Sequence, residues 1–217
     1  MTDELKKNIV WQNINSSIDR GKILEGKIIA IETEKMKDSN IVCAIVDFMG
    51  VKILIPATEI IKDGKNDKKL LRYMMGAEIK FIVVEADKVS EKAVGSRVKA
   101  MEKIKDINLK KIEKEDILYG KIIGIWKKYI RVEVMGIDFI IKAQELQYGY
   151  VEDVSKIYKV NQQIKVRVKE IDIEDKSIKI SIKDLLDDPF KRIRKDFIEK
   201  GEYLARVTGY TDNRYFC

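Results

Sequence analysis

Basic and aromatic side chains gather in the second half of the chain. Two flat rings, Trp126 and Tyr129, lie close together, with cations beside them and further along. Lysine and arginine bind phosphates and aromatic rings stack on bases, which is the chemistry that holds single-stranded nucleic acid on a protein surface. The candidate cations are Lys127, Lys128, Arg131, Lys142, Lys165, Arg167, Lys169 and Lys176.

Each of these residues also has a structural interpretation. A single lysine is usually a solvated surface residue, so only the cluster counts as evidence for binding. Trp126 can equally be buried beneath a neighbouring linker helix, and Tyr129 can pack against a partner on the next strand. The sequence leaves both alternatives open.

The composition argues against catalysis and against a metal site. The chain has no histidine, which removes the commonest general base and the commonest transition-metal ligand. Two distant cysteines cannot form a zinc site alone, and no glycine-rich phosphate loop is present. We therefore expect a protein that is not an enzyme and has no cofactor and no metal. The net charge of +7 favours an acidic partner.

Nothing in the sequence indicates export or a membrane span. The first residues are polar, and no apolar run approaches the ~20 residues that a span needs. Cys43 and Cys217 do not form a disulfide framework. We expect a cytoplasmic monomer without membrane contact.

The chain repeats itself at domain-sized spacing. Leu24-Glu-Gly-Lys-Ile-Ile-Ala-Ile31 returns as Leu118-Tyr-Gly-Lys-Ile-Ile-Gly-Ile125, and six of the eight positions are identical. Two further pairs of blocks follow in the same order, 49–60 with 135–146 and 79–85 with 164–170. Ordered blocks of this kind indicate a duplicated domain of about 75 residues, large enough for a small β-barrel.

Periodicity predicts a helix at 3–20, with Trp11 as a packing anchor, followed by two sets of five strands. The strands are expected at 27–31, 41–48, 51–55, 79–84 and 94–98, and again at 120–125, 129–134, 137–142, 164–170 and 177–182. Five short strands with a helical turn after the third suggest an OB-type barrel.

The expected fold is mainly β, with tandem five-stranded OB-fold barrels joined by short helical linkers and preceded by an N-terminal helix. Asp188-Pro189 signals the start of a second linker helix, and the residues after Gly201 repeat the opening of the earlier copies. The domains are expected at 1–20 (helix), 21–100 (first barrel), 101–116 (charged linker), 117–186 (second barrel), 187–201 (linker helix) and 202–217 (an incomplete third repeat).

Four segments resemble the repeats of the bacterial ribosomal protein S1 family. Gly50-Val-Lys-Ile-Leu-Ile-Pro-Ala-Thr-Glu-Ile60 is similar to the segment that ends the third strand of such repeats, and Gly95-Ser-Arg97 to the end of their last strand. Residues 171–181 resemble their closing hairpin, and Asp188-Pro-Phe with Lys200-Gly201 resembles their linker. The resemblance covers residues 21–217 and is that of a fragment or a divergent relative.

This resemblance implies an RNA-binding face on each barrel. In the second copy the family's positions fall on Lys128, Arg131 and Lys142, and on Asp172 with Lys176 around the last hairpin. Basic residues thus replace the family's aromatic residues, with Trp126 and Tyr129 nearby.

The other copies fit the family's face less well. The first copy has Ile45 and Pro56 at these positions, and only Asp87 and Arg97 resemble the family. In the third repeat Tyr215 and Phe216 fall near the aromatic positions. The second copy is therefore the expected RNA contact.

We expect a non-catalytic protein that binds single-stranded RNA in translation and can contact the small ribosomal subunit. One alternative is a docking module that contacts a protein or the ribosome through the first copy; another is an accessory region of a larger RNA-processing enzyme. The RNA-binding residues are expected to be Trp126, Lys127, Lys128, Tyr129, Arg131, Lys142, Arg167, Lys169, Asp172 and Lys176.

Overall fold

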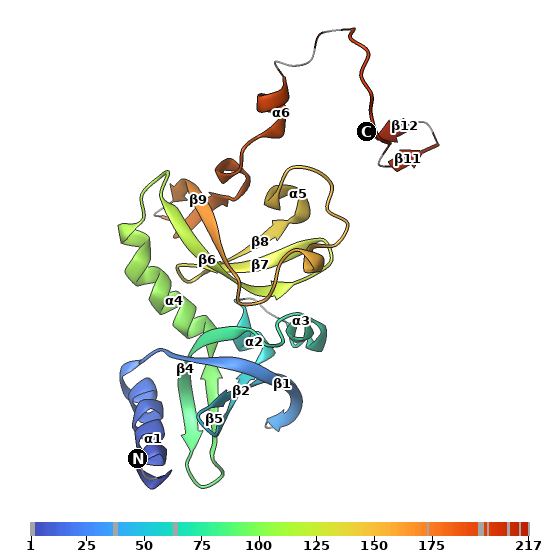
Figure 1. Cartoon of the computed structure of the whole chain (residues 1–217). Coiled ribbons are helices and arrows are strands. Elements are labelled where there is room, and N and C mark those ends of the chain that lie inside the picture. The colour runs from blue at the N-terminus through green and yellow to red at the C-terminus, as the bar shows by residue number, and fades with distance from the viewer. Residues whose placement is uncertain are drawn as a thin grey trace. The chain divides into compact units, whose positions relative to one another are not determined.

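A computed structural model describes residues 3–36, 39–62, 65–172, 174–194, 198, 200–207, 209–212 and 214–216. The contacts divide the chain into two compact units, Met1–Leu185 and Leu186–Cys217. The first unit holds both five-stranded sheets, and the second holds a short helix and a hairpin (Figure 1).

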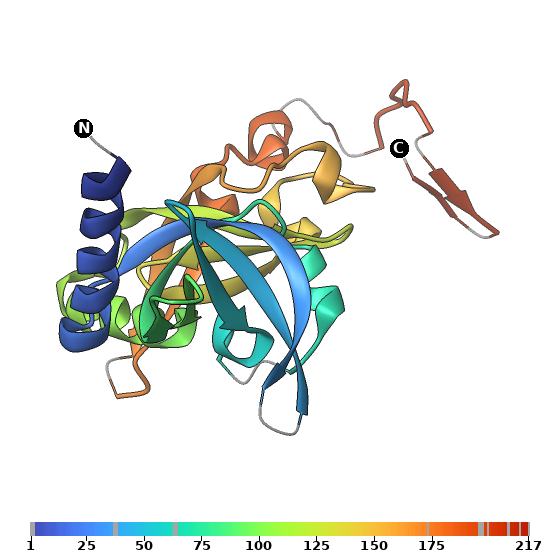
Figure 2. The ribbon, with the colours of Figure 1, turned by 90° about the horizontal axis from the view of Figure 1, so that it is seen from below.

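The first barrel is a closed ring of five strands in the order β1-β2-β3-β5-β4. Every pair is antiparallel except β3 with β5, which run parallel. Helix α1 lies alongside the strands (Figure 2). The elements are α1 (Asp3–Arg20), β1 (Leu24–Met36), β2 (Ser39–Phe48), β3 (Val51–Pro56), α2 (Ala57–Ile60), α3 (Lys68–Arg72), β4 (Glu78–Asp87) and β5 (Lys92–Ser96).

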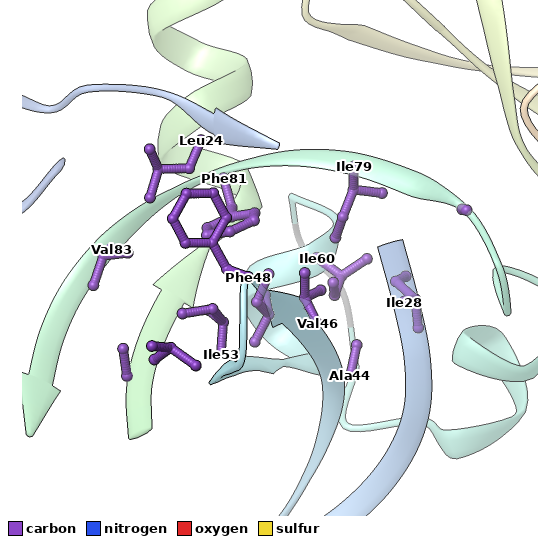
Figure 3. Packing of buried hydrophobic residues seen from close by; sticks show 14 of the residues in the cluster. Leu24, Ile28, Ala44, Val46, Phe48, Ile53, Ile60, Ile79, Phe81 and Val83 are labelled. Atoms are coloured by element: carbon purple, nitrogen blue, oxygen red, sulfur yellow. The ribbon is translucent and has the colours of Figure 1, made fainter. Parts of the chain in front are cut away.

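The core of the first barrel is filled by inward-facing side chains of the strands. Phe48 and Phe81 meet edge to face with ring centres 6.2 Å apart (Figure 3). Trp11 and Ile14 of α1 are buried in the same cluster. The expected role of Trp11 as a packing anchor is confirmed, because only 5% of it is exposed.

The two barrels are joined by α4 (Arg97–Asn108) and the short helix η1 (Leu109–Lys111). The prediction that the last strand of the first barrel continues to residue 98 is wrong. The Ser96 side chain accepts a hydrogen bond from the Lys99 amide at 3.1 Å and thereby caps the helix. The helix therefore begins at Arg97.

The second barrel repeats the strand order of the first, as β10-β9-β6-β7-β8. Met49-Gly50 and Met135-Gly136 form the same tight turn with positive φ in the two barrels. In the described part of the chain β8 and β10 are not hydrogen-bonded, whereas their counterparts β3 and β5 are. The elements are β6 (Ile117–Ile125), β7 (Tyr129–Val134), β8 (Ile137–Lys142), α5 (Ala143–Leu146), η2 (Val154–Lys156), β9 (Gln163–Asp172), β10 (Ser177–Ser181) and η3 (Lys183–Leu185). The predicted fold class, with OB-type sheets and an N-terminal helix, is confirmed.

A buried arginine connects the barrels. The Arg97 guanidinium donates to both carboxylate oxygens of Asp138 at 2.8 and 2.7 Å and to the Ile60 carbonyl at 2.9 Å. Burial disfavours its charge, but Asp138 and Glu133 more than offset this, so the pKa of Arg97 lies above its ordinary value. Ile123 of β6 also packs into the core of the first barrel. The barrels thus share packed and charged contacts.

The second unit contains α6 (Pro189–Ile193), β11 (Gly209–Thr211) and β12 (Arg214–Phe216). The linker helix begins at Pro189 as predicted but ends at Ile193, and part of its expected span, including Phe197, lies outside the described residues. The expected opening strand at 203–210 is largely absent, because 201–207 has no regular structure. Among the described residues of this unit the strands form a two-stranded hairpin, which is too small to enclose a barrel core.

No helix in the described part of the chain is both long and apolar enough to cross a membrane.

Candidate nucleic-acid interface

The loop between β6 and β7 presents the first group of predicted binding residues. The Lys128 carbonyl accepts a hydrogen bond from the Ala143 amide at 2.9 Å, and the Lys127 carbonyl accepts one from the Val154 amide at 3.0 Å. These bonds hold the loop between the end of β8 and η2. The two lysine side chains are exposed, so the backbone is fixed while the cations remain in solvent.

A cleft opens beside this loop. It has a volume of about 630 Å³, and we call it the aromatic–basic cleft. Tyr150 is 84% exposed on its wall, and the Lys128 ammonium lies 5.2 Å from the centre of that ring. The cleft therefore offers flat rings and cations together. Its lining residues are Lys128, Tyr129, Lys142, Ala143, Gln144, Gly149, Tyr150 and Val151.

Trp126 lies behind the cleft in an aromatic stack. Its ring centre is 4.7 Å from that of Tyr129, nearly parallel, and 4.9 Å from that of Tyr73 in the first barrel. The ring also covers Gly124, where a Cβ would come within 2.8 Å of the indole. Trp126 thus packs against tyrosines of both barrels. Tyr129 stacks on Trp126 and reaches the cleft as well.

The cleft lysines are not engaged by carboxylates. Neither Lys128 nor Lys142 forms an ion pair with any residue that the structure describes, and both side chains are exposed. An ammonium group without a local counterion is available to a phosphate. Lys142 also stands at the start of α5, where Glu145 accepts from its backbone amide at 3.2 Å.

Arg131 lies away from the cleft in the junction between the barrels. It follows Tyr129 on the same side of β7, but there the side chain is only 11% exposed. Its guanidinium is 3.6 Å from Asp138. Burial lowers the pKa of Arg131, and Asp138 opposes that effect. The structure therefore separates Arg131 from the cleft, in contrast to the grouping expected from the sequence.

Arg167 and Lys169 lie on β9, which is separated from β7 by β6. Arg167 is 3.6 Å from Glu115, and Lys169 is 2.5 Å from Asp184. The hydrogen bond from Lys169 holds the pKa of Asp184 below its usual range. These cations are paired within the barrel and do not line the cleft.

The hairpin residues Asp172 and Lys176 also have local partners. The Asp172 carboxylate accepts from the Asp175 amide at 2.9 Å, and the Lys176 ammonium bonds Asp106 of α4 at 2.7 Å. The hydrogen bond to Asp106 raises the pKa of Lys176. In the second unit Tyr215 is 77% exposed on β12; Phe216 belongs to the same strand, but its side chain lies outside the described residues.

Two tyrosines of the site were not predicted. Tyr150 follows the helical turn after β8 in the segment Tyr148-Gly-Tyr150, whose aromatic spacing could have drawn attention to it. Tyr73 comes from the first barrel, and no local pattern could reveal its contact with Trp126.

Comparison with known proteins shows what the second barrel is similar to. Residues 111–183 match the family model described as the S1 RNA binding domain. The chain is 27% identical over 201 residues to small ribosomal subunit protein bS1 of Staphylococcus aureus strain N315, covering 90% of this chain and 48% of that protein. It is 25% identical over 200 residues to bS1 of Staphylococcus haemolyticus, with the same coverage. The chain spans about half the length of these curated relatives.

Among solved structures, a multidomain protein with nucleic acid binding domains from Streptococcus pneumoniae matches 75% of this chain and 51% of its own, with 15% identity and a TM-score of 0.36. GSP13 from Bacillus subtilis matches 48% of this chain and 91% of its own, with 17% identity and a TM-score of 0.29. The family match and the similarity along the chain agree: the second barrel resembles the S1 RNA binding domain, and most of the chain is similar to bacterial bS1.

Proposed function

We propose that this chain is a non-catalytic protein that binds single-stranded RNA in the aromatic–basic cleft of its second barrel. One observation carries the proposal: the cleft combines Lys128 and Lys142, which have no described carboxylate partner, with the rings of Tyr129 and Tyr150. Ammonium groups neutralise phosphates, and exposed rings stack on bases that are free of a duplex.

The packing around the cleft supports this assignment. Trp126 fixes Tyr129 from behind, and the hydrogen bonds at Lys127 and Lys128 fix the loop. A ligand would therefore meet rings and a backbone that are already ordered, which lowers the entropy cost of binding. The side chains that line the cleft suit binding by charge and stacking and carry no step of bond cleavage.

We further propose that the RNA contact serves translation in the cytoplasm, with the chain acting as a monomer that can associate with the small ribosomal subunit. The matched relatives are named as proteins of that subunit.

The test is a titration of a labelled single-stranded RNA of about 16 nucleotides, with a duplex of equal length as control. The logarithm of the binding constant should fall linearly with the logarithm of salt concentration, by about 0.7 per phosphate contact. The single strand should bind more tightly than the duplex. No measurable binding of the single strand at about 50 mM salt would contradict the proposal.

A further inference from the structure

The first barrel carries a basic helix that belongs to neither the family's binding face nor the ion pairs of the fold. Helix α3 has the sequence Lys68-Lys-Leu-Leu-Arg72. Lys68, Lys69 and Arg72 are exposed, and none forms an ion pair with a residue in the described part of the chain. A short basic helix is usually no more than solvated surface. A role in binding has to be argued from where α3 lies relative to the cleft.

The helix is held in place at both ends. At its start the Asp67 carboxylate accepts from the Lys69 amide at 2.7 Å, and Asn66 bonds to β2 through the Val42 amide. At its end Leu71 and Met74 are fully buried in the core of the first barrel. The exposed cations are therefore mounted on an ordered element.

The end of α3 is also the point where the first barrel meets the cleft. Tyr73 directly follows the helix, and its carbonyl accepts from the Ile125 amide of β6 at 3.3 Å. Its ring contacts Trp126, which stacks on Tyr129 of the cleft. Because residues three and four apart share one side of a helical turn, Lys69 lies on the same side as Arg72 and Tyr73. One aromatic stack thus connects the cations of α3 with those of the cleft.

We propose that the two barrels form one composite site, in which single-stranded RNA leaves the aromatic–basic cleft along the Tyr129–Trp126–Tyr73 stack and its phosphates reach α3. The first barrel then takes part in binding through Lys69 and Arg72, and not through the strand face that its family resemblance would indicate. This inference rests on the proposed function of the cleft and adds to it the path and minimum length of the RNA.

Two lengths of RNA test the path. A single strand of about 5 nucleotides fits within one barrel's site, and one of about 24 nucleotides exceeds the largest site of a single OB-type barrel, about 16 nucleotides. The variants are Lys69→Glu with Arg72→Glu on α3, Lys128→Glu with Lys142→Glu in the cleft, and Lys88→Glu with Lys110→Glu as a control with the same change in charge. All six side chains are exposed, so each variant should fold, which circular dichroism can verify.

The composite site predicts a length-dependent loss. The α3 variant should weaken binding of the long RNA about tenfold, and the slope of log K against log salt concentration should become less steep by about 1.4, or two phosphate contacts. Its affinity for the short RNA should change by less than about twofold. The cleft variant should weaken both lengths.

Two results would overturn the composite site while leaving the cleft intact: an α3 variant that weakens the long RNA no more than the control does, or one that weakens both lengths equally. Failure of the cleft itself has a different signature. In that case the unmodified protein binds neither RNA at low salt, or the cleft variant binds both as well as the control does, and both proposals fall.

Discussion

The two barrels place different chemistry at equivalent points of the same scaffold. In the first barrel Cys43 faces Pro56 in the last residue pair between β2 and β3, immediately before α2. In the second barrel Tyr129 faces Lys142 in the equivalent last pair between β7 and β8, immediately before α5. One pair is buried and cannot attract a phosphate, and the other lines a cleft with a ring and a cation. The fold is shared, while the capacity to bind depends on these side chains.

The charges around these points differ as well. In the first barrel Lys52 bonds Glu32 at 2.5 Å and also approaches Glu34, while Cys43, Ile45 and Leu54 form a buried apolar cluster. In the second barrel the cleft lysines lack described carboxylate partners, whereas Arg131, Arg167 and Lys169 are each paired with a carboxylate. A carboxylate partner thus distinguishes the cations that stabilise the fold from the cations that are available to a ligand.

Arg97 should give the largest effect, because it is a structural residue despite its match to the family's binding pattern. Arg97→Ala removes the bidentate partner of Asp138, which keeps Arg131 at 3.6 Å, and should lower the free energy of unfolding by about 3 kcal/mol, the low end for breaking a buried ion pair. Urea denaturation measures this, with the exposed Lys99→Ala as the control, expected within about 0.5 kcal/mol. A loss below about 1 kcal/mol would show that the charged junction does not stabilise the barrels.

Tyr150 should give the next largest effect, on binding. Removing its exposed ring by Tyr150→Ala should cost about 1–3 kcal/mol of RNA binding free energy, the value of one stacked base. Tyr119→Ala is the matched control, since Tyr119 is also exposed and also has a lysine over its ring, but it lies on β6 outside the cleft. Equal losses in a fluorescence titration would mean that the cleft is not the stacking site.

Exchanging one residue between the barrels tests the comparison itself. Lys142→Pro installs the proline of the first barrel; the φ of −74° suits proline, but the amide that donates to Glu145 is lost. The slope of log K for RNA against log salt concentration should become less steep by about 0.7, the contribution of one phosphate contact. Lys142→Ala removes the charge and keeps the backbone amide. It should reduce the slope by the same amount, which would show that the lost charge and not an altered backbone is the cause. An unchanged salt slope in both variants would remove Lys142 from the site.

The smallest effect is expected at the paired cation Lys169. Lys169→Ala should change stability only slightly at neutral pH, because the pair is solvent-exposed, and should leave RNA affinity within about twofold. The pKa of Asp184 is lowered by this pair, so the stabilisation is present above the unfolded pKa of about 3.9 and is lost as pH falls through the lower folded value. Stability curves of the two proteins should converge in acid; a constant difference would contradict this origin.

The strands could be predicted because their signal is local. Alternating burial in β9 and the Met-Gly turns follow from short stretches of sequence. The start of α4 was missed, because Arg97 continues a strand-like pattern and only the Ser96 cap reveals the boundary.

The site could be predicted only in part, for a different reason. Residue type indicated Lys128, Tyr129 and Lys142, which the structure brings together. Whether a cation is paired depends on distant residues, such as Asp106 for Lys176, and a single sequence does not show such partners. Tyr73 was missed because it reaches Trp126 from the other barrel.

The most direct test compares unpaired with paired cations of the same barrel. Lys128→Gln with Lys142→Gln and Arg167→Gln with Lys169→Gln remove the same charge, and binding of the same single-stranded RNA is measured for both at low salt. The account predicts at least about a tenfold loss of affinity for the cleft variant and less than about twofold for the β9 variant. Equal losses would contradict it, because they would mean that net charge, and not the aromatic–basic cleft, determines binding.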